Sequence, residues 1–329
     1  MTNQLFNKET MLPYSLGGML YTPANRKGIA EKIEKGEIRN LRSIAFCLED
    51  AIADEALQDA EKELKTTLSK LRKMKQSGVN IPLVFVRVRN ADHIIRIHEF
   101  LQYGDADAAL MGYILPKFDL SNAEEYLGNI TYVNRSSSHP IYCMPILESL
   151  PIAHAPTRMK ELVKLKFMVD HCPYVLNIRV GGNDFSNLYG VRVPATRTIY
   201  DVGAINSILS DIIAIFGMEY VVSAPVWNYF YGGKDASWKT GLERELEADR
   251  VNGFIGKTAI HPSQLPIIEE QMKVLRSDYD DALKILNWDS NVLGVQKGSD
   301  GNRMNEVKCH YKWARRTAML GEIYGIREG

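Results

Sequence analysis

The chain has 329 residues, 45% of them hydrophobic and 24% charged, so it can bury a substantial core without disulfides. Forty basic residues balance forty acidic residues, which excludes a global field that would attract nucleic acid or an anionic membrane. No apolar stretch reaches the roughly 18 to 20 residues needed to cross a bilayer, and the N-terminal segment 1–15 lacks an apolar signal region. We therefore expect a cytoplasmic globular protein with neither a nucleic-acid nor a membrane partner.

The four cysteines, Cys47, Cys143, Cys172 and Cys309, lie far apart and form no CxxC pair. This spacing indicates neither a disulfide framework nor a structural zinc site. Cys47 and Cys143 fall inside apolar runs, and we expect them to be buried and reduced.

Short apolar runs rich in β-branched and aromatic residues recur along the chain, and each is followed by a polar turn and a stretch of helical period. Between the second and third runs, leucines at steps of three or four predict one amphipathic helix over 55–76. Asp92 and Ser121 are expected to cap the next two helices, the second with a capping box. The runs number eight: 17–23, 43–50, 83–89, 108–117, 141–149, 175–184, 219–227 and 253–262.

Strands joined by helical crossovers form either an open doubly wound sheet or a closed barrel, and eight strands favour closure. The first strand also lacks the GxGxxG turn of a dinucleotide-binding sheet. The predicted fold class is therefore α/β, a (β/α)8 TIM barrel over residues 1–286.

The C-terminal part, residues 287–329, is expected to lie outside the barrel. Residues 263–286 supply one or two closing helices, and 287–301 read as a polar, glycine-containing linker. A final helix over 304–324 has Val307, Tyr311, Ala314 and Ala318 on one face. We expect this helical extension to be a lid or an oligomer contact.

Polar side chains end nearly every predicted strand, at the end of the barrel where active sites form. Taken singly, Glu49 or Asp50 could cap a helix, and His261 could be a turn histidine with its hydrogen bonds satisfied. Together they are better explained by mutual neutralisation around a ligand, because burying unpaired charge is costly. The set comprises Glu49, Asp50, Arg87, Arg89, Lys117, Glu148, Asn183, Asp184 and His261.

Glu148 and Asp184 end neighbouring strands, where two carboxylates repel each other unless a cation lies between them. Mg²⁺ fits such a site and Mn²⁺ is an alternative, with water and substrate completing the coordination. No cluster of His or Cys offers a softer zinc site. Arg87 can bind a carboxylate or a developing enolate oxygen. We expect further substrate contacts from Gly182, Asn183, Pro225 and His261.

Seven motifs in this order, LYTPA, FCLEDAI, VRVRN, ILPK, PILES, GGNDFS and GKTAIHPSQL, resemble the citrate lyase beta-subunit-like branch of the HpcH/HpaI aldolase superfamily. Within it the chain is most similar to the divergent carbon-carbon bond lyases of tellurite-resistance-type gene clusters. The resemblance spans residues 17–265 and implies a magnesium-dependent TIM-barrel lyase. It implies metal ligation by Glu148 and Asp184 and substrate contact by Arg87. It also implies that Glu49 and Asp50 organise metal-bound waters, and that Lys117 is the lysine of the PK motif.

Two features depart from this family pattern. The family usually places a catalytic aspartate in a C-terminal segment, where this chain reads RMNEV and leaves Glu306 as the substitute. No coenzyme A recognition segment is evident, which puts an acyl-CoA substrate in doubt. The resemblance further implies a homo-oligomer, a trimer or a hexamer.

These observations predict a lyase or aldolase that cleaves or forms a carbon-carbon bond beside a 2-oxo acid, through an enolate stabilised by the cation and Arg87. One alternative is an aldolase in which Lys117 forms a Schiff base after its pKa is lowered by desolvation. The other is a barrel that binds a small carboxylate or phosphorylated metabolite without catalysis, as a subunit or regulator.

Overall fold

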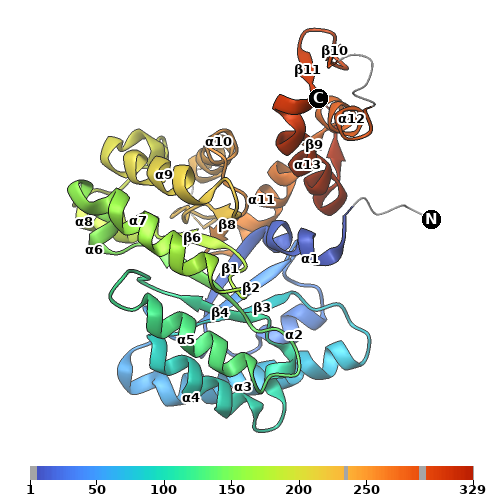
Figure 1. The fold of residues 1–329 in the computed structure, drawn as a ribbon. Coiled ribbons are helices and arrows are strands. Elements are labelled where there is room, and N and C mark those ends of the chain that lie inside the picture. Colours follow the sequence, from blue (N-terminus) through green and yellow to red (C-terminus); the bar gives the residue numbers. More distant parts are fainter. Residues whose placement is uncertain (1–5, 233–235, 289–293, 329) are drawn as a thin grey trace.

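A closed barrel of eight parallel strands forms the centre of the computed structural model, which describes residues 6–232, 236–288 and 294–328 (Figure 1). Residues 1–5 of the N-terminal segment and 289–293 of the expected linker lie outside the described residues. The strand order is β7-β6-β5-β4-β3-β2-β1-β8, and a parallel bridge between Ala224 and Lys257 joins the two ends. The predicted TIM barrel is thus confirmed. Its strands are β1 (Gly18–Pro23), β2 (Ser43–Cys47), β3 (Leu83–Arg87), β4 (Gly112–Leu115), β5 (Tyr142–Leu147), β6 (Ile178–Val180), β7 (Val222–Ser223) and β8 (Lys257–Ala259).

Helices surround the barrel because each carries one apolar stripe. In α3, Leu64, Leu68 and Leu71 are fully buried at helical spacing, as the sequence predicts, although a 3-10 turn at Asp54–Ala56 delays the helix start to Leu57. The helices are α1 (Lys8–Met11), α2 (Ile29–Glu34), α3 (Leu57–Gln76), α4 (Ala91–Gln102), α5 (Ala123–Asn134), α6 (Leu150–Ala153), α7 (Ala155–Asp170), α8 (Gly182–Leu188), α9 (Gly203–Phe216), α10 (Ser237–Val251) and α11 (Leu265–Met272).

Both predicted helix caps are wrong by one or two residues. Asn90, not Asp92, caps α4, since its side chain accepts the His93 N–H at 3.0 Å. Ser121 forms no capping box. Its hydroxyl donates to Asp119, and α5 begins after Asn122. In each case another short polar residue lies within two positions of the predicted cap and takes a competing local hydrogen bond.

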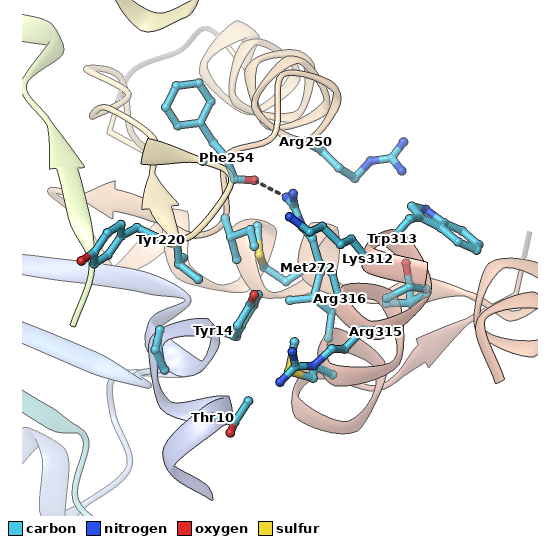
Figure 2. Close-up of a pocket in the computed structure, with 18 of the residues that line it drawn as sticks. Thr10, Tyr14, Tyr220, Arg250, Phe254, Met272, Lys312, Trp313, Arg315 and Arg316 are labelled. Atoms are coloured by element: carbon cyan, nitrogen blue, oxygen red, sulfur yellow. Dashed lines mark hydrogen bonds between the residues drawn. The ribbon is translucent and has the colours of Figure 1, made fainter. Parts of the chain in front are cut away.

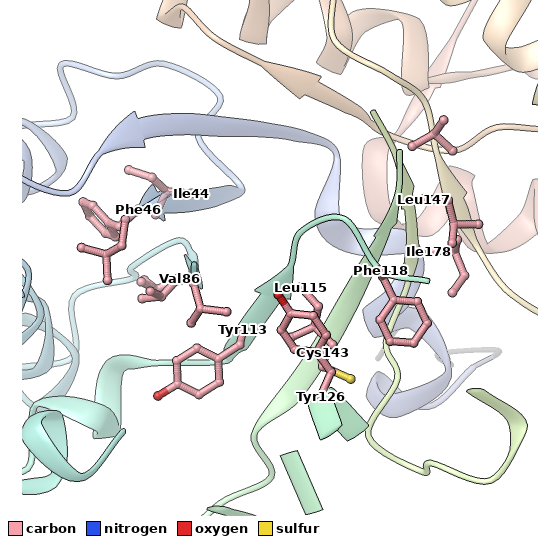
Figure 3. Packing of buried hydrophobic residues seen from close by; sticks show 14 of the residues in the cluster. Ile44, Phe46, Val86, Tyr113, Leu115, Phe118, Tyr126, Cys143, Leu147 and Ile178 are labelled. Atoms are coloured by element: carbon pink, nitrogen blue, oxygen red, sulfur yellow. The ribbon is translucent and has the colours of Figure 1, made fainter. Parts of the chain in front are cut away.

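Side chains alternate between two packed layers along the strands. Met19, Ala45, Phe85, Ile114 and Met144 fill the barrel interior. Their neighbours point outward into the layer between strands and helices, where Ile44, Phe46, Val86, Leu115 and Leu147 pack (Figure 3). Cys47 and Cys143 are buried, as predicted. Because the interior is filled by side chains, chemistry is confined to the barrel ends.

The C-terminal extension packs on the amino-terminal end of the barrel. The Tyr324 hydroxyl donates to the Tyr14 carbonyl oxygen at 2.6 Å, and Arg316 donates to the Gly253 carbonyl oxygen at 3.1 Å. Within one chain α13 therefore does not cover the carboxyl ends of the strands, so the predicted lid is not formed there. The extension contains β9 (Val274–Leu275), α12 (Arg276–Leu286), β10 (Val295–Lys297), β11 (Met304–Glu306), α13 (Val307–Tyr324) and β12 (Ile326–Arg327).

The extension also begins earlier, and its last helix later, than the sequence analysis expects. β9 pairs with β12 and α12 packs on α13, which groups residues 274–286 with the extension. Residues 304–306 pair with β10 and so are extended, which moves the start of α13 to Val307. In the described part of the chain, no helix is long and apolar enough to cross a membrane.

A buried charge cluster ties β8 to α10 beside the bridge that closes the barrel. The Lys257 ammonium is fully buried and lies 2.8 Å from both Glu245 Oε1 and Asp249 Oδ2. The Tyr200 hydroxyl donates to Asp249 at 2.7 Å. Burial raises the Asp249 pKa to about 6, even though Lys257 acts to lower it. Such a cluster is stable only while every member is present.

We predict that Lys257→Met, which leaves two carboxylates buried without their cation, lowers the free energy of unfolding by about 3 to 5 kcal/mol. Urea denaturation followed by circular dichroism measures this change. Lys239→Met, on the exposed face of α10, is the matched control and should change the free energy of unfolding by about 0.5 kcal/mol or less. A loss below about 1 kcal/mol in Lys257→Met would contradict the cluster's stabilising role.

Candidate active site

Charged side chains gather where the strands end. Glu49 and Asp50 follow β2, Arg87 ends β3, Lys117 follows β4, and Glu148 follows β5. Asp184 lies in the first turn of α8, directly after β6. The carboxyl ends of parallel strands in a barrel meet at one mouth. The structure therefore brings together these six residues of the predicted set.

Arg87 is the centre of this group. Its Nη2 atom lies 2.8 Å from Glu49 Oε2, 3.1 Å from Asp50 Oδ2 and 3.2 Å from Glu148 Oε1. Burial acts to lower the Arg87 pKa, but the surrounding carboxylates, Glu148 foremost, raise it overall. Arg87 is thus a fixed cation, and Nη2 is its nearest nitrogen in all three ion pairs.

Lys117 connects β4 to the same group through backbone and side chain. Its φ of 49° is uncommon for a residue other than glycine, and its N–H donates to Glu148 Oε1 at 3.0 Å. Its Nζ lies 2.6 Å from Glu49 Oε1. Partial burial lowers the Lys117 pKa, but the hydrogen bond to Glu49 and the charges of Glu49 and Asp50 raise it overall. A Schiff-base lysine needs the opposite shift, so the geometry disfavours that alternative.

Glu148 and Asp184 are the adjacent carboxylates that the sequence predicts. Glu148 is only 4% exposed, and Asp184 lies within hydrogen-bonding reach of it. Burial raises the Glu148 pKa to about 8; Arg87 acts against this shift and the Asp184 charge adds to it. The shift arises mainly from burial, and the neighbouring Asp184 charge adds to it.

The arrangement fits a hard divalent cation. Four carboxyl groups, those of Glu49, Asp50, Glu148 and Asp184, face two cations, Arg87 and Lys117, so full ionisation leaves two negative charges unmatched. Among the residues that the structure describes, no group of three or more His, Cys, Asp or Glu side chains could hold a metal ion. A cation here would have Glu148 and Asp184 as protein ligands and take its others from water and substrate.

The two glycines before Asp184 make room for protein side chains. A Cβ on Gly181 would lie 2.1 Å from Glu148 Oε2, and a Cβ on Gly182 would lie 2.7 Å from Ile199 and 2.8 Å from Pro225. Glu148 makes the close approach at Gly181, and Ile199 and Pro225 make it at Gly182. The substrate contact expected from Gly182 stays a prediction.

The remaining predicted substrate contacts lie around the mouth with differing exposure. Pro225 is buried after β7, and Asn183 is exposed and lines a small hollow with Ile199 and Trp227. His261 stacks on Phe230 at 4.7 Å, and its Nδ1 accepts the Ser263 N–H. This is the turn role that the sequence analysis weighs for His261. Burial, and then the charge of Arg26, lower its pKa.

Glu306 lies outside this group within one chain. It ends β11 in the C-terminal extension, and its N–H donates to the His310 ring at 2.9 Å (Figure 1). The extension packs on the opposite end of the barrel. The catalytic role expected of Glu306 stays a prediction.

Sequence reasoning missed Arg179 and Tyr21. Arg179, on β6, is 2% exposed inside the barrel; its Nη2 donates to Thr258 Oγ1 at 2.6 Å, and its Nε has no hydrogen-bond partner. Its guanidinium lies 5.7 Å from the centre of the Tyr21 ring. Burial raises the Tyr21 pKa, while Arg179 and Arg87 lower it. The signal was an arginine inside an apolar strand, two residues before Gly181.

Comparisons with known proteins agree with this architecture. A family model described as a C-C bond lyase of the TIM-barrel fold matches residues 10–326. The (3S)-malyl-CoA thioesterase of Cereibacter sphaeroides is 27% identical over 249 residues, which cover 76% of this chain and 74% of that protein.

Two solved structures, both from Mycobacterium tuberculosis, share the fold. CitE in complex with magnesium, acetoacetate and coenzyme A has a TM-score of 0.61 at 17% identity, with 94% of this chain and 100% of that chain covered. The citrate lyase beta subunit with oxaloacetate and magnesium has a TM-score of 0.52 at 18% identity, with 79% of this chain and 98% of that chain covered.

The glycine before α8 provides a test of the site geometry. In Gly181→Ala, the new methyl group meets Glu148 Oε2 and must displace that carboxylate. We predict that the affinity for Mg²⁺, measured by isothermal titration calorimetry, falls by about tenfold or more, as expected when one ligand is misplaced. Gly203→Ala, where an added Cβ meets nothing within 4 Å, should leave the affinity unchanged. Equal affinities in the two variants would contradict this account.

Proposed function

Because the chain belongs to the carbon-carbon bond lyase family of the TIM-barrel fold, we propose that it is a magnesium-dependent lyase that cleaves or forms the carbon-carbon bond next to the carbonyl group of a small 2-oxo acid. The observation that carries this proposal is the convergence of Glu148, Asp184 and Arg87 at one mouth. The magnesium and oxaloacetate bound by a structural relative are consistent with it.

Glu148 and Asp184 would hold the cation, which could be Mn²⁺ in place of Mg²⁺. When bound, it supplies Lewis acidity that polarises the substrate carbonyl. Arg87 places a second positive charge at the same mouth, where ion pairs hold its side chain. As the bond beside the carbonyl breaks, its electron pair moves toward the carbonyl oxygen. Arg87 then stabilises the negative charge of the resulting enolate.

Glu49 is the residue suited to exchange a proton with the substrate. Burial raises its pKa despite the charge of Arg87, and Lys117 holds its Oε1 at 2.6 Å. In the cleavage direction, the Glu49 carboxylate would take the proton of the substrate hydroxyl group, which becomes the carbonyl group of the leaving aldehyde, and would then return that proton to the enolate carbon. Asp50, more exposed and also within 3.1 Å of Arg87, orients waters at the rim.

A thioesterase reaction is the second candidate, favoured by one observation. The relative named (3S)-malyl-CoA thioesterase is similar over three quarters of the chain. The same carboxylates and cation would then orient a water against a thioester carbonyl. The two candidates differ in whether a carbon-bound proton is exchanged.

Proton exchange at pyruvate C3 tests the proposal without knowledge of the full substrate. In D₂O with Mg²⁺, we predict that the wild-type protein replaces the methyl protons with deuterium, followed by ¹H NMR. Glu148→Gln and Asp184→Asn should each slow the exchange by about a hundredfold or more, since each removes a cation ligand. Glu99→Gln, an exposed acid on α4, is the matched control and should be unaffected.

Each alternative gives a different outcome in the same assay. Exchange that persists in EDTA, together with trapping of Lys117 by borohydride and pyruvate, would establish the Schiff-base route instead. Hydrolysis of malyl-CoA without exchange would establish the thioesterase. Pyruvate binding with neither reaction would leave a metabolite-binding barrel.

The raised pKa of Glu148 predicts a pH dependence for cation binding. Below pH 8 the carboxyl group holds a proton that Mg²⁺ must displace. We therefore expect the Mg²⁺ affinity to rise by about tenfold per pH unit up to about pH 8 and then to level off. Calorimetry at several pH values, in buffers of different ionisation enthalpy, measures both the affinity and the released proton. Glu148→Gln should remove this dependence, and a flat profile in the wild type would contradict the assignment.

A further inference from the structure

A second cavity lies at the end of the barrel opposite the candidate active site. It has a volume of about 770 Å³, within the range of small-molecule sites. One wall comes from the segments that precede β1, β6, β7 and β8, including Tyr14, Leu176, Tyr220 and Phe254. The other wall is α13, with Lys312, Trp313, Arg315 and Arg316 (Figure 2).

The walls of this cavity carry a surplus of positive charge. Six cations line it: Arg250, Lys273, Lys312, Arg315, Arg316 and Arg327. Among the described residues the lining contains two acids, and both are held by cations outside the cavity: Glu219 pairs with Lys166, and Asp278 lies 2.6 Å from Arg303. Arg250 and Lys273 pair with Glu247 and Glu270 outside the cavity. The surplus of positive charge therefore lies with Lys312, Arg315, Arg316 and Arg327.

Arg316 is a cation of this cavity without an acidic side chain as its partner. Its Nη2 donates to the carbonyl oxygens of Gly253 and Phe254 at 3.1 and 3.3 Å (Figure 2). Among the described residues it forms no ion pair, and the nearby Tyr14 hydroxyl is a weak partner. Burial lowers the Arg316 pKa, which reflects the cost of a desolvated charge without a carboxylate. Lys312, one helical turn away on α13, also forms no ion pair among these residues.

The same cavity offers flat apolar surface. Tyr14 and Trp313 contribute aromatic rings, and Met272 and Met319 contribute adaptable side chains. Phe254 contributes its backbone carbonyl, because its ring packs in the core against Tyr200. A cationic group beside aromatic and thioether side chains suits a ligand with an anionic head and a planar body. Two cations without a carboxylate partner fit a phosphate, whose two charges and several acceptor oxygens exceed what a single carboxylate presents.

We propose that this cavity is a binding site for an organic phosphate with a planar body, of the nucleoside monophosphate class. Arg316 and Lys312 bind the phosphate, and the aromatic side chains contact the base. The ligand bridges α13 and the loop that precedes β8, so its binding fastens the C-terminal extension to the barrel. The site is separate from the mouth that holds Glu148 and Asp184.

Calorimetric titration of the full chain with AMP tests the proposal. We expect saturable binding of AMP that weakens about tenfold or more in Arg316→Gln and in Lys312→Gln, the loss of one charge-assisted hydrogen bond each. Lys308→Gln, an exposed lysine on the same helix that does not line the cavity, should bind as the wild type does. Adenosine and inorganic phosphate, each lacking half of the ligand, should both bind about tenfold or more weakly.

Further measurements distinguish AMP binding in this cavity from AMP binding at the active site. AMP affinity should be unchanged in Asp184→Asn, and AMP should raise the melting temperature of the wild type but not of Lys312→Gln. If Arg316→Gln fails to fold, the exposed Lys312 decides the outcome. The proposal is overturned if AMP shows no saturable binding at about 5 mM. Unchanged AMP binding in Lys312→Gln, loss of binding in Asp184→Asn, or equally tight binding of inorganic phosphate would also overturn it.

Discussion

Two carboxylates repel each other in a poorly hydrated barrel mouth, and the rest of the site is arranged around this repulsion. Glu148 is 4% exposed and has Asp184 beside it, so ionising both without a cation is costly, and the raised Glu148 pKa records that cost. Neighbouring elements are shaped to keep Glu148 there. Gly181 clears the space for Oε2, and the left-handed backbone of Lys117 turns an N–H toward Oε1.

Arg87 limits this repulsion without removing it. A single guanidinium nitrogen serves Glu49, Asp50 and Glu148, so its charge is divided among three acids. Lys117 is directed to Glu49 and Asp50, not to the Glu148 side chain. Positive charge is therefore lacking where the carboxylates of Glu148 and Asp184 meet. A site that keeps such a deficit is poised for a ligand of positive charge, and the pKa shift and the choice of cation are two consequences of one arrangement.

Much of the fold and of this site could be predicted because both follow from periodic patterns. Eight apolar runs with helical spacers specify the barrel, and the rule that carboxyl ends of strands converge brings Arg87, Glu148 and Asp184 together without knowledge of any distance. The features that the sequence left open or misplaced depend on contacts that a pattern does not contain. The pKa direction of Lys117 depends on which acids its ammonium meets, and the position of α13 depends on how Tyr324 and Arg316 meet the amino-terminal loops. Residues 304–306 are extended because they find a partner strand.

A formal net charge of zero conceals the separation of unmatched charges along the barrel axis. Lys257 is neutralised where it lies, by Glu245 and Asp249, and so has no bearing on ligands. At the mouth, acids outnumber cations. Arg179, paired in register with Ile146 two residues below Glu148, adds positive charge beneath that mouth. At the opposite end, Arg316 has carbonyl oxygens in place of a carboxylate. Because burying an unmatched charge opposes folding, its persistence at both ends indicates that each end is completed by a ligand, of positive charge at one and of negative charge at the other.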